Sequence, residues 1–210
     1  MIKRTLEFQC NQLSLTLGDK ILFQDFNFSF KGPGIILIEG DNGVGKSSLL
    51  KTFAGFITPL SGKIKFLDNS KQILNPEMSY LTTTSLGLMS DLTGSEHIYL
   101  VGNILNLSAL EIQRKIEEFK SIIIFEEVLL KKVSDQSQGM KQLLRLFLHL
   151  LVDRKIIFLD EPFLYLSPKT REEIQKKIEF LATTSLIFIT DQKFSWIPVA
   201  KTEMVILGSL

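Results

Sequence analysis

Continuous apolar runs and helical patterns alternate along most of this chain. Three runs, at residues 35–38, 156–159 and 186–189, consist only of Ile, Leu and Phe. Uninterrupted runs of this length predict strands that are buried on both faces, as in a parallel sheet. Helical patterns follow at about residues 48–54 and 140–152 and after Pro168. This alternation predicts an α/β fold with a mostly parallel core sheet.

Shorter patterns predict further strands at both ends of the chain. Residues 5–30 carry apolar pieces on either side of a turn at residues 18–19, which predicts an N-terminal antiparallel β-layer. Residues 63–67 alternate apolar and polar side chains, as in a half-exposed strand. Residues 78–82 predict another strand, and residues 204–207 predict a strand at the edge of the sheet.

The middle of the chain has a helical pattern from residue 95 to about residue 133. Ser108 followed by Glu111 has the form of a capping box, which predicts the start of one helix. Ser167 followed by Pro168 predicts the start of another, because proline suits the first helical position. We therefore expect one domain spanning residues 1–210, with a helical subdomain inserted at about residues 94–150.

Composition and charge exclude some classes of partner. The 24 basic and 23 acidic residues give a net charge of +1, so we expect no nucleic-acid partner. Mean hydropathy is high at +0.19, yet no apolar run approaches the 18 residues that span a bilayer. A membrane-embedded partner would account for such an apolar chain. The single cysteine, Cys10, and the absence of a signal peptide favour a reducing compartment, with Cys10 as a core residue.

A glycine-rich loop follows the first continuous run and precedes a helix. Its glycines permit a tight turn whose amide groups, with the helix N-terminus, can hold phosphate oxygens. We expect Lys46 to reach the outer phosphates of a nucleotide and Ser47 to bind Mg²⁺. The predicted nucleotide-binding residues of this P-loop are Gly40, Asp41, Asn42, Gly43, Val44, Gly45, Lys46, Ser47 and Ser48.

Two adjacent carboxylates end the second continuous run. Asp160 and Glu161 follow residues 156–159 at the carboxyl end of the predicted strand, where α/β sheets bind their ligands. We expect Asp160 to orient Mg²⁺ or its waters. Glu161 is the candidate general base for the water that attacks the γ-phosphate.

With these motifs the chain resembles the ATP-binding subunits of ABC transporters over nearly its whole length. Residues 136–142 resemble the family signature that normally reads LSGGQ, with Ser137 and Gly139 kept. The resemblance implies a P-loop NTPase of ABC type that uses ATP and Mg²⁺. It also implies a head-to-tail dimer, homomeric or heteromeric, in which Ser137 and Gly139 contact ATP bound to the partner. Taken alone, residues 136–142 also fit the start of an ordinary helix capped by Ser137.

Four positions depart from the family pattern. Leu17 replaces the aromatic residue that commonly stacks on adenine, Ser85 a glutamine, Ser167 an aspartate and Asp191 a histidine. At about 5 Å from the γ-phosphate and an effective dielectric constant of about 20, the Asp191 carboxylate would repel it by about 3 kcal/mol per unit charge. Applied to the transition state, that energy corresponds to about a hundredfold in rate. Lys193 could compensate, and His97 and His149 are expected to be structural.

Residues 80–88 and 92–98 resemble those of the haem-exporter ATPase of cytochrome c maturation. This implies export of haem, transmembrane permease subunits as partners, and a peripheral position on the cytoplasmic face of the inner (plasma) membrane, or the matrix face in a mitochondrion. A multidrug- or polysaccharide-type exporter remains the alternative. Leu86, Leu88, Met89 and Leu92 either form the permease docking groove or fill the core.

Two other functional classes are a regulatory ATP-binding subunit and a GTPase. The substitutions at residues 85, 167 and 191 are compatible with a regulatory subunit that binds ATP and hydrolyses it slowly. A GTPase is disfavoured, because the chain contains no Asn-Lys-x-Asp motif for reading guanine. The leading expectation is therefore a transport-coupled ATPase.

Overall fold

A computed structural model of the chain describes residues 6–18, 20–69, 71–72, 78–81, 87–122, 124–196 and 198–208. The chain divides into two compact units, each of which is described by itself. The described parts of Met1–Tyr80, Arg154–Asp160 and Ile178–Leu210 form a sheet unit. Leu81–Asp153 and Glu161–Lys177 form a helical unit.

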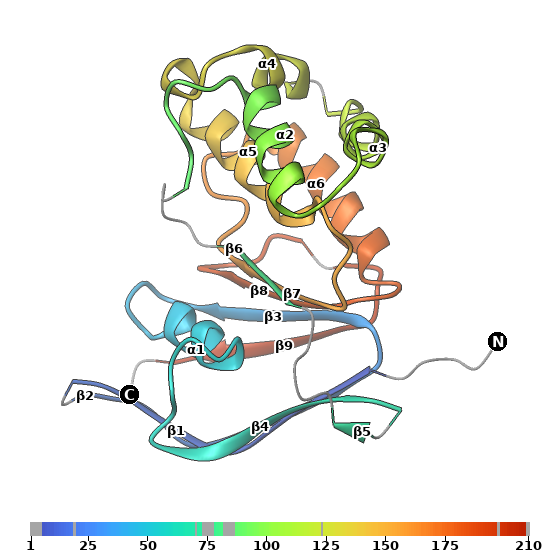
Figure 1. Ribbon diagram of the computed structural model, residues 1–210. Helices are drawn as coiled ribbons and strands as arrows, with labels where there is room; N and C mark the ends of the chain where they lie inside the picture. The colour runs from blue at the N-terminus through green and yellow to red at the C-terminus, as the bar shows by residue number, and fades with distance from the viewer. Residues whose placement is uncertain are drawn as a thin grey trace. The chain divides into compact units, whose positions relative to one another are not determined.

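The sheet unit contains an antiparallel layer of four strands in the order β2-β1-β4-β5 (Figure 1). β1 pairs with both β2 and β4, so that Phe8 lies opposite Phe30 on one side and Phe66 on the other. This confirms the predicted N-terminal antiparallel layer. The strands are β1 (Leu6–Leu17), β2 (Lys20–Lys31), β4 (Ser61–Asp68) and β5 (Lys71–Gln72).

The second sheet of this unit has five strands in the order β6-β7-β8-β3-β9. β3 pairs in parallel with β8 and β9, and β7 pairs in parallel with β8. The three predicted buried strands are therefore confirmed, the structure shows that they are neighbours, and the last strand lies at the edge as predicted. The strands are β3 (Gly34–Gly40), β6 (Met78–Leu81), β7 (Ile156–Asp160), β8 (Leu186–Asp191) and β9 (Thr202–Leu207).

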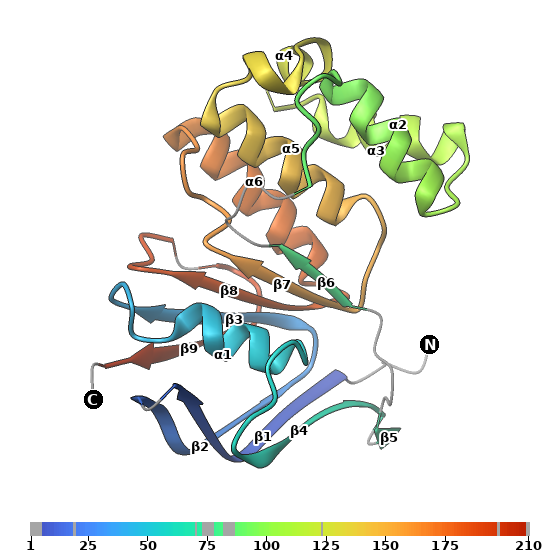
Figure 2. The same ribbon diagram turned by 60° about the vertical axis from the view of Figure 1, so that its left-hand side comes forward.

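Helix α1 (Lys46–Phe53) lies between the parallel sheet and the antiparallel layer in both views (Figures 1 and 2). The core between them is rich in phenylalanine. The Phe8 ring packs 4.8 Å from Phe53 of α1 and 4.9 Å from Phe188 of β8, both edge to face. Phenylalanines from three separate elements thus join the layer, the last residue of α1 and the sheet in one core.

The described residues of the helical unit form mainly α-helices, and the unit also includes most of α6, residues 168–177 (Figure 2). Helix α2 packs against α3, α4 and α5. This arrangement agrees with the predicted helical insertion. The elements are α2 (Gly94–Ile104), α3 (Ala109–Phe119), α4 (Phe125–Leu130), the 3-10 turn η1 (Val133–Asp135), α5 (Gln138–Leu150) and α6 (Pro168–Leu181).

Local capping sets two of these helix starts. The predicted box is present at α3, where the Ser108 hydroxyl accepts from the Glu111 amide and the Glu111 carboxylate accepts from Ser108. A second box, between Thr93 and Glu96 at α2, has the same spacing and was not predicted. Its signal, threonine followed three residues later by glutamate, is present in the sequence.

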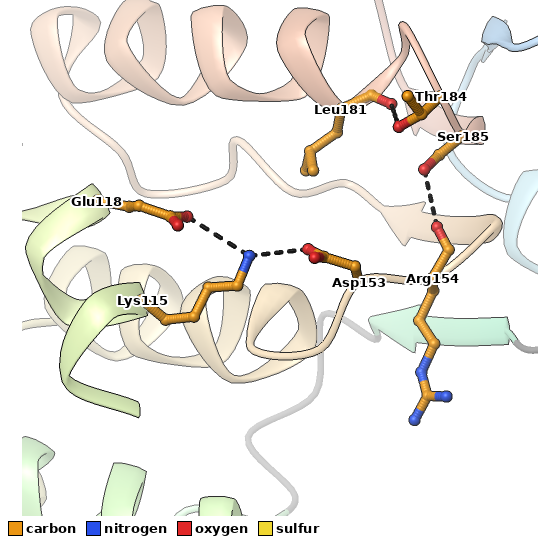
Figure 3. A network of polar contacts seen from close by, with 7 residues as sticks. All are labelled: Lys115, Glu118, Asp153, Arg154, Leu181, Thr184 and Ser185. Carbon is orange, nitrogen blue, oxygen red and sulfur yellow. Dashed lines mark hydrogen bonds and ion pairs between the residues drawn. The ribbon is translucent and has the colours of Figure 1, made fainter. Parts of the chain in front are cut away.

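Figure 3 shows polar contacts between residues at or near the ends of helices and strands, within each unit. In the helical unit, Lys115 of α3 donates to Asp153, which follows α5, at 2.8 Å and to Glu118 at 3.4 Å. In the sheet unit, the Ser185 hydroxyl donates to the Arg154 carbonyl at 2.8 Å, so the starts of β7 and β8 are held in register. Among the described residues, no helix combines the length and apolarity needed to cross a membrane.

Candidate functional site

The loop between β3 and α1 depends on three glycines for two different reasons. Gly43 and Gly45 have φ of 80° and 105°, in the left-handed region that side chains disfavour. Gly45 is also the N-cap of α1, and a Cβ on it would lie 3.1 Å from the Phe23 ring. Gly40 is needed for close packing, because a Cβ there would lie 2.7 Å from the Leu207 carbonyl oxygen. Contacts with β2 and β9 therefore leave no room for a side chain at Gly45 and Gly40.

Lys46 begins α1 and is buried. Its Nζ donates to the carbonyl oxygens of Gly40 at 2.7 Å and Asp41 at 3.0 Å. The ammonium group is thus held across the mouth of the loop by loop carbonyls. The first intrahelical bond is from the Leu49 amide to the Gly45 oxygen at 2.8 Å. The amides of the preceding helical residues have no intrahelical acceptor, which suits them to bind an anion.

Ser47 and Thr190 converge on one oxygen of Asp160. The Ser47 hydroxyl donates to Asp160 Oδ1 at 2.9 Å, and the Thr190 hydroxyl donates to the same atom at 2.7 Å. Asp160 is buried at the end of β7, and Thr190 is fully buried in β8. Sequence reasoning paired Ser47 with Asp160 in function but missed Thr190. Its signal was a single hydroxyl at the end of the third apolar run.

This donor set fits Mg²⁺. Magnesium takes oxygen ligands and is usually held by one or two protein groups together with phosphates and waters. One hydroxyl and one carboxylate, already in contact, meet that requirement. Among the described residues there is no group of three or more His, Cys, Asp and Glu that would form an all-protein metal cage.

The other predicted loop residues have mixed exposure. Asp41 and Asn42 are exposed, whereas Val44 and Ser48 are half-buried. The Ser48 carbonyl accepts from the Thr52 hydroxyl at 2.8 Å, which places it in the first turn of α1. A ligand in the loop could therefore reach the exposed residues directly.

Glu161 follows Asp160 and is half-buried. Its φ of 46° lies in the left-handed region, and so does the φ of 65° at Tyr165. The Leu164 amide donates to the Glu161 carbonyl at 3.2 Å, which closes a turn after β7. Non-glycine residues in this conformation are strained and must be held by their surroundings.

Ser137 and Gly139 lie at the start of α5 in the helical unit. Ser137 is the N-cap, and its exposed hydroxyl accepts from the Met140 amide at 3.2 Å. The predicted helix start is thus present. A Cβ on Gly139 would lie 2.6 Å from the Tyr165 carbonyl oxygen, so glycine is required there by packing within the unit.

Three of the positions that depart from the family pattern are described. Leu17 ends β1 with 63% of its surface exposed. Ser167 caps α6, since its hydroxyl accepts from the Thr170 amide at 3.2 Å. Asp191 ends β8 opposite Glu39 of β3, and it accepts from the Gln192 amide at 2.8 Å. Two carboxylate residues therefore occupy adjacent strand ends. Ser85 lies outside the described residues.

Other candidates from the sequence have structural surroundings. Cys10 is buried in the core, and burial raises the pKa of its thiol to about 12. His97 is buried on α2, and burial lowers its pKa. His149 contacts the Arg145 carbonyl through Nδ1 at 2.9 Å. Of the apolar candidates for docking, Met89 is exposed and Leu88 and Leu92 are half-buried, whereas Leu86 lies outside the described residues.

The parallel sheet, the glycine-rich loop that leaves β3 and the carboxylate at the end of β7 together define an α/β P-loop NTPase. The family model described as "ABC transporter" matches residues 23–164, which is more than half of the chain. The chain therefore belongs to the ABC transporter family, as an ATP-binding domain.

The curated proteins that it resembles include ATP-binding proteins named for import and for export. It is 33% identical to the thiamine import ATP-binding protein ThiQ of Haemophilus influenzae, over 85% of this chain and 86% of that protein. A solved structure, the ADP conformation of MJ1267, an ATP-binding cassette of an ABC transporter, matches with a TM-score of 0.71. That match is 20% identical and covers 90% of this chain and 82% of the other.

A third match concerns the resemblance to the haem-exporter ATPase of cytochrome c maturation. The chain is 43% identical to the cytochrome c biogenesis ATP-binding export protein CcmA of Mannheimia succiniciproducens, but over only 67 residues. These are 32% of this chain and 30% of that protein. The chain also spans just over half, 52–58%, of the length of several curated relatives that it matches.

Proposed function

We propose that this chain is the ATP-hydrolysing subunit of a membrane transporter, with residues 1–210 acting as one ABC-type domain. The observation that carries the proposal is the contact of Ser47 and Thr190 with one oxygen of Asp160, directly beside the loop that leaves β3. A hydroxyl from the first turn of α1 and a carboxylate from β7 are thereby joined by a hydrogen bond. Such a pair suits a magnesium nucleotide.

Each site residue then has a defined task. The amides of the loop and of the first turn of α1 hold phosphate oxygens, and Lys46 exchanges its loop carbonyls for the outer phosphates. Ser47 and Asp160 hold Mg²⁺, which neutralises phosphate charge when bound. Glu161, the next residue after Asp160, accepts a proton from the attacking water.

A second ABC ATPase domain would complete the site. The Ser137 hydroxyl and the start of α5 are exposed in the single chain, so a partner nucleotide could bind there. The partner is a second copy or a sister chain. Closure of such a dimer around ATP would drive transmembrane permease subunits. In that assembly the chain would be peripheral, at the cytoplasmic face of the membrane or the matrix face of a mitochondrion.

For the transported substrate we propose haem, in cytochrome c biogenesis. The support is the segment of 67 residues that is 43% identical to CcmA. Crosslinking in native membranes with ATP present, followed by identification of the bound subunits, tests this assignment. Recovery of haem-handling subunits supports haem export, whereas recovery of another permease replaces haem with a multidrug, polysaccharide or imported substrate.

Hydrolysis itself is tested by Glu161→Gln in the assembled transporter. We expect turnover to stop while MgATP binding persists, because the amide cannot accept the proton but occupies the same volume. Glu173→Gln, on α6 and not among the residues given a task above, is the control. Unchanged turnover of the Glu161 variant would remove this residue from the mechanism.

A second candidate is a regulatory subunit that binds ATP and hydrolyses it slowly. The observation in its favour is the pairing of Asp191 with Glu39 at adjacent strand ends, which adds negative charge beside the loop that leaves β3. Negative charge near the phosphates would oppose the transition state. Wild-type turnover that matches the Glu161→Gln background would favour this candidate.

A further inference from the structure

Arg145 is a buried cation that the proposed mechanism does not use. It lies on α5 with only 5% of its surface exposed. Nη1 donates to Gln142 Oε1 at 3.0 Å, and Nε has no hydrogen-bond partner among the described residues. No ion pair between Arg145 and a carboxylate is found among the residues that the structure describes. Burying a charge without an opposite charge is costly, so stability alone does not explain an arginine here.

Gln142 connects Arg145 to the turn after β7, because it hydrogen-bonds to both. The side chain is 1% exposed, and its Nε2 donates to the Pro162 carbonyl at 3.1 Å. A guanidinium can only donate, so Arg145 fixes which end of the amide faces it. The amide NH2 group is then left to face Pro162. Without Arg145, the buried Gln142 oxygen loses its donor, so the side chain that donates to the Pro162 carbonyl is no longer held at both ends of its amide.

The turn that receives this hydrogen bond is strained. Glu161 and Tyr165, on either side of Pro162, both have positive φ. The same helix also contacts the far end of the turn, because Gly139 packs against the Tyr165 carbonyl with no room for a Cβ. Helix α5 therefore holds this turn at two places, Gln142 near Glu161 and Gly139 near Tyr165.

We propose that Arg145 and Gln142 are a positioning pair, which holds the Pro162 carbonyl and thereby sets the direction in which Glu161 presents its carboxylate. This inference rests on the proposed function, in which Glu161 accepts the proton. The pair does not touch the nucleotide. It acts on the backbone of the residue that follows Glu161.

The first test is Arg145→Met in the full chain assembled with its transporter. The variant keeps the volume and the apolar stem but removes the charge and the donor. We expect kcat for ATP hydrolysis to fall about tenfold, because misplacement of a catalytic group by a fraction of an ångström is enough for such a loss. KM for ATP should change by less than about twofold. The melting temperature should not fall, because an uncompensated charge has been removed.

Two further variants separate positioning from simple damage to the fold. Arg145→Lys can still donate to Gln142 and should restore most of kcat. Leu146→Val, at the next and fully buried position of α5, is the matched control. It should lower the melting temperature and leave kcat unchanged. In a double-mutant cycle, Arg145→Met combined with Gln142→Leu should be no slower than Gln142→Leu alone.

A readout independent of hydrolysis keeps this inference separate from the proposed function. The Leu164 and Leu166 amides close the turn by donating to the Glu161 and Phe163 carbonyls. Their hydrogen exchange should accelerate in Arg145→Met and not in Leu146→Val, whether or not the chain hydrolyses ATP. Unchanged exchange, or an unchanged kcat in an enzyme that Glu161→Gln inactivates, would overturn the positioning role. Accelerated exchange in a chain without turnover would sustain the contact and overturn the hydrolytic function instead.

Discussion

The Thr190 hydroxyl donates a 2.7 Å hydrogen bond to Asp160 Oδ1, inside the parallel sheet. The two residues are Cα partners at the ends of β8 and β7. Thr190 therefore fixes the carboxylate from the protein side while Ser47 contacts the same oxygen from α1. Under the proposed function, a carboxylate held in this way would receive a cation with little reorganisation.

Thr190→Val tests that arrangement. Valine has the same shape without the hydroxyl, so one hydrogen bond to a charged group is lost, worth about 1.5–3 kcal/mol. We expect the Mg²⁺ concentration needed for half-maximal ATP binding to rise about tenfold in a titration with fluorescent nucleotide. Ser185→Ala removes a hydroxyl from the same strand region, far from the loop, and should leave that concentration unchanged.

Gly45→Ala and Gly43→Ala distinguish strain from packing in the P-loop. Both glycines have positive φ, which costs a side chain about 1–2 kcal/mol. A Cβ at Gly45 also meets the Phe23 ring, whereas one at Gly43 meets nothing within 4 Å. We expect the larger loss of thermal stability and of nucleotide affinity in Gly45→Ala. Equal losses would show that contact with Phe23 contributes nothing.

Asp191→His should accelerate hydrolysis. The substitution removes a carboxylate next to Glu39 and introduces a hydrogen-bond donor. Using the repulsion of about 3 kcal/mol at about 5 Å, the gain in kcat is up to about a hundredfold. Asp191→Asn removes the charge without supplying the imidazole, so comparison of the two variants separates these effects. A slower enzyme in both cases would mean that the aspartate has a role of its own.

His97 gives a pH dependence of stability. Burial lowers its pKa below the ordinary value of 6.5, and its Nδ1 has no partner among the described residues. The unfolded chain therefore takes up a proton more readily than the folded one. The contribution of neutral His97 is complete above about pH 6.5 and is lost as pH falls below that value. Urea unfolding at pH 7.5 and 5.5 should show a smaller difference in His97→Gln than in the wild type.

Much of the fold was predictable because local patterns carry it. The run at residues 35–38 is apolar at every position, short, and followed by glycines, which suits a strand covered on both faces. The capping box at Ser108 was predicted from two residues three apart, and the equivalent box at Thr93 could have been. Helix boundaries shifted by about two residues, as for α5, which spans Gln138–Leu150 instead of 140–152.

In the candidate site, too, some features follow from local sequence and others from tertiary contacts. The sequence by itself determined the P-loop, the carboxylates after β7 and the family, since each depends on residue types at fixed spacing along the chain. Only the tertiary structure decided that Thr190 contacts Asp160, that Phe23 confines Gly45, and that Arg145 reaches Pro162 through Gln142. These contacts join residues from different strands, helices and turns. No periodicity or motif encodes them, because they depend on how side chains pack when distant segments meet.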